Sequence, residues 1–169
     1  YTLSAPELIV SLWLDRNKPA GRFDTGLKHL TARGGVVQLS TIKRNGQQLL
    51  GGVELKCLRF DYDASRQLCT ARGPDGLVKV DNSNITQSQR SFDGRFGLQK
   101  RCYAIVEGFD TLQYFLDQNR MVADGGTKQI HIGYVPVNQR AYGQPVNATA
   151  GRIVAELVST EAGQLDITT

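Results

Sequence analysis

The segment CLRFDYDASRQLCTARG, residues 57–73, has the pattern of a β-hairpin. Apolar and polar residues alternate from Leu58 to Tyr62, a polar stretch follows Asp63, and a shorter strand leads to Gly73. Alternation with a period of two is typical of a strand with one buried face, and Asp favours turns because its carboxylate bonds nearby backbone. Residues 111–126, TLQYFLDQNRMVADGG, repeat the same order. The chain therefore uses one hairpin pattern more than once.

Four units of this kind follow one another, which is the pattern of stacked architectures. They are VSLWLD with LTARGGVVQLS (10–15 and 30–40), CLRFDYD with CTARGPDGLVKVD (57–63 and 69–81), TLQYFLD with MVADGGTKQIHIGY (111–117 and 121–134), and a weaker ATAGRIVAELVSTEAGQLDI (148–167). Three second strands align through Ala32, Ala71 and Ala123. A hairpin with one apolar face cannot bury that face alone, so we expect the hairpins to stack over a shared interior.

Residues 1–169 are predicted to form a single all-β domain of about four hairpin repeats. Stacked antiparallel hairpins would form an open-ended β-jelly roll or a sheet folded into a groove, with glycines at the bends. Turn signals such as Asn45-Gly46 and Gly125-Gly126 occur at the right distances. Residues 108–118 read alone as a short helix, but their alignment with residues 58–65 favours a strand.

Charge and hydropathy exclude some classes of protein. Twenty Lys and Arg against sixteen Asp and Glu give a net charge of +4 and a pI near 9.1, which weakly favours anionic partners. The preferred interpretation is an ordinary solvated surface of mixed charge, because no block of like charges appears. No apolar run approaches the ~20 residues of a membrane-spanning helix, so we expect a soluble domain with no transmembrane segment. The chain starts at Tyr1 without a signal-peptide pattern, which suggests a processed chain or an excised piece.

The cysteines and histidines do not predict a metal site or any cofactor. Cys57, Cys69 and Cys102 cannot all pair within one chain. A Cys57–Cys69 disulfide would need a register that brings them side by side, and buried thiols that fill the core are the alternative. His29 and His131 have no clustered ligands nearby and are expected on the surface of strands.

No catalytic residue is predicted, and the chain is expected not to be an enzyme. A nucleophile elbow, a phosphate loop, a zinc pattern and a dinucleotide fingerprint are absent from the sequence. Asp61 and Asp63 lie near each other, and two aspartates beside a turn usually cap it. A less favoured alternative uses these carboxylates in an enzyme that acts on polysaccharide. Nucleic-acid binding is not expected, because the aromatic residues alternate as core residues do.

The inward faces of the hairpins are predicted to line an apolar groove that takes acyl chains. The predicted groove residues are Leu12, Leu14, Leu58, Phe60, Val78, Val80, Leu112, Leu116, Ile130 and Ile132. Burying an acyl chain of about a dozen methylenes at ~0.8 kcal/mol each would supply on the order of 10 kcal/mol before ordering costs. The alternative is a closed core without a ligand, since any β-sandwich needs such residues.

Basic residues at the rim of the groove would meet the phosphates of a glycolipid. Lys43, Arg44, Arg72 and Lys79 form the predicted rim, and further candidates are Arg33, Arg95, Lys100 and Arg101. The alternative is that these are ordinary surface charges on outward strand positions.

The repeated hairpin, with an apolar strand that ends near Tyr-Asp or Leu-Asp and a return strand like LTARGGVVQL, resembles lipopolysaccharide-transport proteins of the OstA/LptA type. The similarity covers most of residues 3–135 and continues faintly to 167. The resemblance implies an open-ended β-jelly roll that receives the acyl chains of lipopolysaccharide or a lipid A-like amphiphile. The chain departs from the simplest pattern in its long first turn, 16–29, and in the polar connection 82–101.

The resemblance also implies a place in the cell and partners. It predicts a periplasmic binding and transport module in outer-membrane biogenesis of a Gram-negative envelope, either free or as a domain of a larger outer-membrane protein. Its partners would be copies of itself or other envelope transport proteins, joined by pairing of edge strands. The alternative function is a structural scaffold that assembles end to end, or belongs to a larger translocon, without bound lipid.

Overall fold

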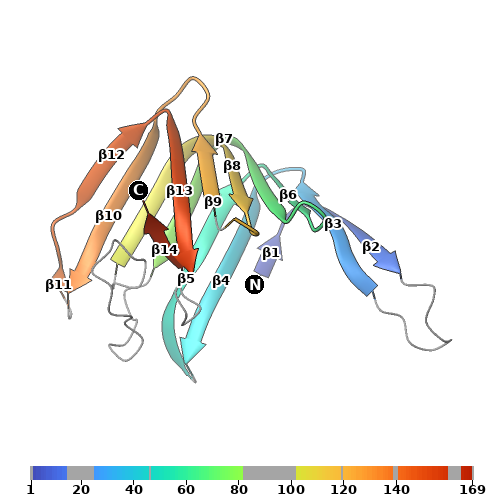
Figure 1. Cartoon of the computed structure of the whole chain (residues 1–169), viewed down its shortest axis with the longest axis horizontal. Coiled ribbons are helices and arrows are strands. Elements are labelled where there is room, and N and C mark those ends of the chain that lie inside the picture. The colour runs from blue at the N-terminus through green and yellow to red at the C-terminus, as the bar shows by residue number, and fades with distance from the viewer. Residues whose placement is uncertain are drawn as a thin grey trace.

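The computed structural model describes residues 2–14, 25–45, 47–81, 102–118, 120–138, 141–159 and 165–168. All regular structure in these ranges is β, as predicted, and the antiparallel sheet curls into a half-barrel (Figure 1). The strands are β1 (Thr2–Ser4), β2 (Glu7–Leu14), β3 (Thr25–Arg33), β4 (Val37–Asn45), β5 (Gln48–Cys57), β6 (Arg59–Asp63), β7 (Leu68–Asp81), β8 (Cys102–Phe115), β9 (Arg120–Asp124), β10 (Ile130–Asn138), β11 (Ala141–Tyr142), β12 (Val146–Ala150), β13 (Arg152–Ser159) and β14 (Leu165–Thr168).

The sheet is folded along a line into two layers, and the chain crosses this line repeatedly as it passes from one layer to the other. On one side of the fold, layer A has the order β2-β3-β6-β7-β8-β9-β13-β14, and on the other side, layer B has the order β1-β4-β5-β7-β8-β10-β12. β7 and β8 are long enough to belong to both layers. We call the line where the chain passes from one layer to the other the corner.

The predicted hairpin repeats are the hairpins of layer A. β2 pairs with β3, β6 with β7, β8 with β9, and β13 with β14, all antiparallel. These four pairs correspond to the four units read from the sequence, and residues 111–115 form a strand and not a helix. Repetition of the hairpin therefore extends layer A, while layer B contains the segments between the units together with the ends of their return strands, residues 37–40, 77–81 and 130–134.

The corner is built where the alternation of side chains is interrupted. Gly34, Gly73, Gly108 and Gly126 lie there with positive φ, a conformation that glycine adopts without strain. In β7 the pairing with β8 shifts on both sides of Gly76, as in a bulge, which lets one strand bend from layer A into layer B. A Cβ at Gly76 would overlap Cε2 of Phe109, so the absence of a side chain leaves room for that ring.

Candidate functional site

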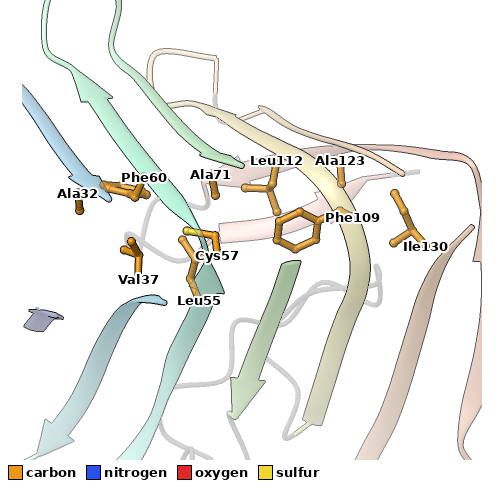
Figure 2. Close-up of a cluster of buried hydrophobic side chains, with 10 residues drawn as sticks. All are labelled: Ala32, Val37, Leu55, Cys57, Phe60, Ala71, Phe109, Leu112, Ala123 and Ile130. Atoms are coloured by element: carbon orange, nitrogen blue, oxygen red, sulfur yellow. The ribbon is translucent and has the colours of Figure 1, made fainter. Parts of the chain in front are cut away.

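The concave side of the corner carries a row of apolar residues that crosses layer A. The strand registers place them in line, and large and small side chains alternate: Leu8, Ala32, Phe60, Ala71, Leu112, Ala123 and Ile153. Figure 2 shows the five central members side by side. The alanines aligned in the sequence repeats are the small members of this row, which we call the corner row.

Layer B supplies the other half of the packing at the corner. Val37, Leu55, Cys57, Phe109 and Ile130 lie below the corner row in Figure 2 and belong to the same buried cluster. Val37, Phe109 and Ile130 are completely buried. The corner is therefore a closed apolar floor, packed as a protein core is packed.

Away from the corner, the concave face stays apolar and most of its residues are less deeply buried, although Cys102, on the same face of β8 as Val106, is completely buried. The next row in layer A contains Leu30, Tyr62, Cys69, Tyr114 and Met121, and the matching row in layer B contains Leu3, Leu39, Leu55, Val78 and Val106. Leu55, in the middle of its row, is buried in the core cluster, whereas the other members of the two rows are partly buried. The two layers thus present facing apolar rows above a closed floor.

Most of the predicted groove residues share this concave face, in two different situations. Phe60, Leu112 and Ile130 are buried in the floor. Val78 packs against the floor from layer B, and Val80, two residues along the same strand, lies one row farther out and is partly buried. Ile132 faces the same side because it pairs with Val106. The alternative of a closed core therefore describes the floor, and the groove interpretation applies only to the outer rows.

The structure does not place the other four predicted groove residues among these packed residues of the concave face. Leu58 is 44% exposed on the convex side, because the corner interrupts the strand and turns both Cys57 and Phe60 inward. Leu12 is exposed on the edge strand β2. Leu116 is partly buried in the turn after β8, and the side chain of Leu14 lies outside the described residues.

The four predicted rim residues do not form one site. Arg72 follows the inward Ala71 and so lies on the convex side of the corner. Lys79 lies between the inward Val78 and Val80 and so points to the outer face of layer B. Lys43 and Arg44 belong to the end of β4 far from the corner, which is where a groove would open, and their side chains are outside the described residues. The candidates Arg95, Lys100 and Arg101 also lie outside the described residues.

Asp61 lies on the outer face of layer A, within a polar network. Arg59 donates to both carboxylate oxygens at 2.7 and 3.0 Å, and Thr31 Oγ1 donates at 2.7 Å. Burial raises the pKa of Asp61, but the hydrogen bonds from Arg59 and Thr31 outweigh this effect and hold it below its ordinary value. His29 Nε2 lies 3.1 Å from Thr31 Oγ1, and Thr31 is itself buried. The network ties β3 to β6.

Asp63 caps its turn, as predicted. Its Oδ1 accepts hydrogen bonds from the backbone N–H and the hydroxyl of Ser65 and from the N–H of Arg66. The bond from the Ser65 hydroxyl is the main reason that the pKa of Asp63 is lowered. A general acid next to a general base needs two carboxyls with pKa values pushed apart, whereas both of these are lowered. Neither faces the concave side.

The three cysteines are free thiols. Cys69 is opposite Tyr62 in the register of β6 and β7, so the hairpin does not bring it beside Cys57. Cys57 lies in the core cluster, which agrees with a thiol that fills space. Burial raises the pKa of Cys57 and of Cys102 to about 11, so neither is a ready nucleophile at neutral pH.

The outer face of layer B has a shallow hollow of about 290 Å³. His131, Glu107 and Thr149 are neighbours across three strands there, and His131 is exposed as predicted. The hollow lies on the side of layer B opposite to the apolar rows. Within the described ranges, no group of three or more His, Cys, Asp or Glu residues is arranged to hold a metal ion.

No family model, curated protein or solved structure matches the chain. The resemblance to lipopolysaccharide-transport proteins therefore stays a prediction from the hairpin motif. The described ranges contain no helix, and hence none with the length and apolar character of a membrane span.

Two surfaces were not found by reading the sequence for sites. The first is the edge strand β2, whose apolar residues are exposed on both faces; the run of apolar residues in ELIVSLWL was a usable signal. The second is the convex side of the corner, where exposed apolar residues lie beside arginines. No local signal marks it, because its residues come from four separate bends.

Proposed function

We propose that the chain is a non-enzymatic carrier module that holds the acyl chains of an amphiphile between layers A and B. The observation that supports this most is the pair of facing apolar rows, most of whose side chains remain only partly buried above the closed floor. Partly buried side chains such as Val106, Met121 and Val80 offer surface that an acyl chain would remove from water. A fully closed core would leave no such surface.

The hairpin resemblance supports a narrower form of the proposal. The ligand would be lipopolysaccharide or a lipid A-like glycolipid, and the site of action would be the periplasm of a Gram-negative envelope. The net charge of +4 agrees with a ligand that carries phosphates. Lys43 and Arg44, at the far end of β4, are the best placed of the predicted rim residues to meet them.

The first experiment is native mass spectrometry of the chain with and without lipid A. A stoichiometric complex is the expected result, and a hydrophobic fluorescent probe displaced by lipid A but not by its deacylated form would place the acyl chains in the site. A chain that stays free of lipid while the probe is not displaced would overturn the proposal.

A pair of matched variants locates the binding. Val80→Asn introduces a polar group on the concave face, and Ile105→Asn introduces the same group on the outer face of the adjacent strand. Both positions are partly buried, so their effects on folding are comparable. We expect Val80→Asn to weaken lipid A binding about tenfold, which corresponds to roughly 1.4 kcal/mol, and Ile105→Asn to leave it unchanged. Equal effects in two folded variants would contradict a concave site.

The edge strand supports a second candidate function, a scaffold that assembles by strand pairing. Among the described residues β2 pairs only with β3, and Leu8, Ile9, Val10, Leu12 and Trp13 are 42–57% exposed. An edge strand with apolar side chains on both faces is a template for another strand. Charged residues usually protect such edges, and here only Glu7 does so.

Trp13 makes this alternative easy to measure, because it is the only tryptophan of the chain and lies on β2. Self-association through β2 would shift its emission to shorter wavelength as protein concentration rises. Ile9→Lys should abolish the shift and the multimers seen in sedimentation velocity, while Ile42→Lys, at another exposed position, should not. Multimers that persist in Ile9→Lys would exclude this edge as the interface.

A further inference from the structure

The convex side of the corner bears four exposed apolar residues from neighbouring bends. At each bend, a few residues separate the last inward-facing side chain of one layer from the first inward-facing side chain of the other layer. These separating residues lie on the convex side of the corner. Pro6, Val36, Leu58 and Pro74 are in this position and exposed; Val36 is 64% and Leu58 44% exposed. We call these four residues the apolar ridge.

Contacts between the bends bring the members of the apolar ridge together. Val37 pairs with Cys57, so the next residues outward, Val36 and Leu58, are neighbours. The N–H of Leu58 donates to the carbonyl of Arg72 at 2.9 Å, which holds its bend against β7. On the other side, Pro6 lies over Gly34 and Gly35, with its Cγ 3.0 Å from the position of a Cβ at Gly35.

Three arginines accompany the ridge in layer A. Arg59 pairs with Arg72 across β6 and β7, and Arg33 is next to Arg59 because Ala32 pairs with Phe60. All three side chains are exposed. Like charges on directly opposite strand positions destabilise a sheet, so folding alone gives no reason for this arrangement.

The carboxylates nearby neutralise this arginine row only in part. Glu7 Oε2 accepts from Arg33 Nε, and Asp61 accepts from Arg59. Arg72 has no ion pair with any carboxylate in the described part of the chain. Farther along the same line of residues, Thr111 lies opposite Arg72, Asp124 opposite Thr111, and Arg152 opposite Asp124. At the bend of β7, the exposed Asp75 pairs with Lys128 at 3.1 Å. With Arg33 paired to Glu7 and Arg59 to Asp61, the excess of positive charge in the N-terminal half of the corner is the single charge of Arg72.

We propose that the N-terminal half of the convex corner docks on a membrane surface rich in anionic lipids, with the apolar ridge inserted at the level of the head groups. A guanidinium binds phosphate with two parallel hydrogen bonds, which suits the arginine row to lipid phosphates. Apolar tips flanked by basic residues are the arrangement by which proteins lie on a bilayer surface.

This docking face is separate from the proposed lipid groove. The apolar ridge and the arginine row lie on the outside of the bends, whereas the acyl chains would lie inside. A module docked in this way would keep its concave face and the far ends of both layers away from the membrane. Variants on the two sides of the corner should therefore act independently.

Co-sedimentation with vesicles tests the proposal on the full chain. We expect binding to vesicles of phosphatidylglycerol, weakened by added salt, and little binding to vesicles of phosphatidylcholine. Arg72→Ala should lower the partition coefficient about fivefold, as expected for one basic residue at an anionic surface, and Arg152→Ala, also exposed at the corner, should change it much less. Equal effects of the two substitutions would overturn the proposal.

The apolar ridge is tested with a second matched pair. Leu58→Ser should weaken vesicle binding about tenfold, because a large apolar side chain is removed from the lipid, whereas Ile42→Ser, at an exposed residue of layer B, should not. Val36→Ser serves as a second ridge variant should Leu58→Ser lose its fold. Val80→Asn should retain full vesicle binding, which separates docking from uptake of lipid into the groove. Heparin that binds as tightly as vesicles, and is not affected by Leu58→Ser, would indicate a soluble polyanion and overturn membrane docking.

Discussion

Large apolar residues are buried in the middle of the corner row and exposed at its end. Phe60 and Leu112 are 7% and 6% exposed, whereas Leu8, in the same line of cross-strand neighbours, is 51% exposed. The middle of the row has strands on both sides and layer B beneath it. At the end, β3 is the only neighbour of β2 among the strands that the structure describes. Burial along this row therefore follows the position of the strand in the sheet and not the hydrophobicity of the residue.

The largest expected effect tests this difference directly. Phe60→Glu and Leu112→Glu each place a charge in the closed floor, where no partner is available, and should cost at least about 4 kcal/mol of stability, enough to prevent folding of an ordinary domain. Leu8→Glu should cost less than about 1 kcal/mol because the side chain already reaches water. Urea denaturation followed by circular dichroism measures both. A folded Phe60→Glu variant would mean that the floor is open to water.

The second prediction concerns how tightly the corner is packed. Gly76→Ala places a methyl group against the Phe109 ring and should cost about 1–3 kcal/mol, since an overfilled core must move. Gly151, at the last bend, has nothing within 4 Å of an added Cβ, so Gly151→Ala should stay within about 0.5 kcal/mol of the parent. Adding Phe109→Leu to Gly76→Ala should recover part of the loss. Strict additivity of the two changes would show that the ring and Gly76 do not meet.

The third prediction concerns the polar network around Asp61 on the outer face of layer A. Asp61→Asn removes the charge that holds Arg59 and Thr31 and should cost about 1–3 kcal/mol at neutral pH. The pKa of Asp61 is lowered in the folded state, so its contribution is complete above the pKa of the unfolded chain, near ~4, and is lost as the pH falls through the lower folded value. Asp117→Asn, in an exposed turn, is the control and should change little. An Asp61→Asn variant that is as stable as the parent at neutral pH, or that loses as much stability as the parent between neutral and acidic pH, would rule out this role.

The smallest expected effect on stability is at the far end of β4. Lys43→Glu should leave the free energy of unfolding within about 0.5 kcal/mol, because it lies at a hairpin end away from the corner. It should weaken the affinity for lipid A by reversing a charge at the proposed rim. Fluorescence displacement measures the affinity. Unchanged affinity in the folded variant would show that the rim assignment is wrong.

Local sequence patterns predict much of the fold, and the predictions that fail concern single residues beside the bends. Alternation and turn residues predict the strands of all four repeats, the capping role of Asp63 and the concave position of Phe60, Val78 and Ile130. The pattern fails at Leu58, because a bend within the strand reverses the side on which the next residues lie. It fails again at Arg72, which was expected at a rim and lies on the convex side of the corner. A bend is decided by contacts with neighbouring strands, which a single segment does not contain.

The sequence by itself determined the class of fold and the unit from which it is built, because the period of a strand and the chemistry of a turn act over a few residues. The tertiary structure alone decided that the hairpins of the repeats lie side by side in layer A, while the ends of their return strands and the segments between them form layer B. It also decided which apolar residues close the floor, which remain exposed on β2, and which arginines gather beside the apolar ridge. These outcomes depend on register and folding of the sheet, which join residues tens of positions apart.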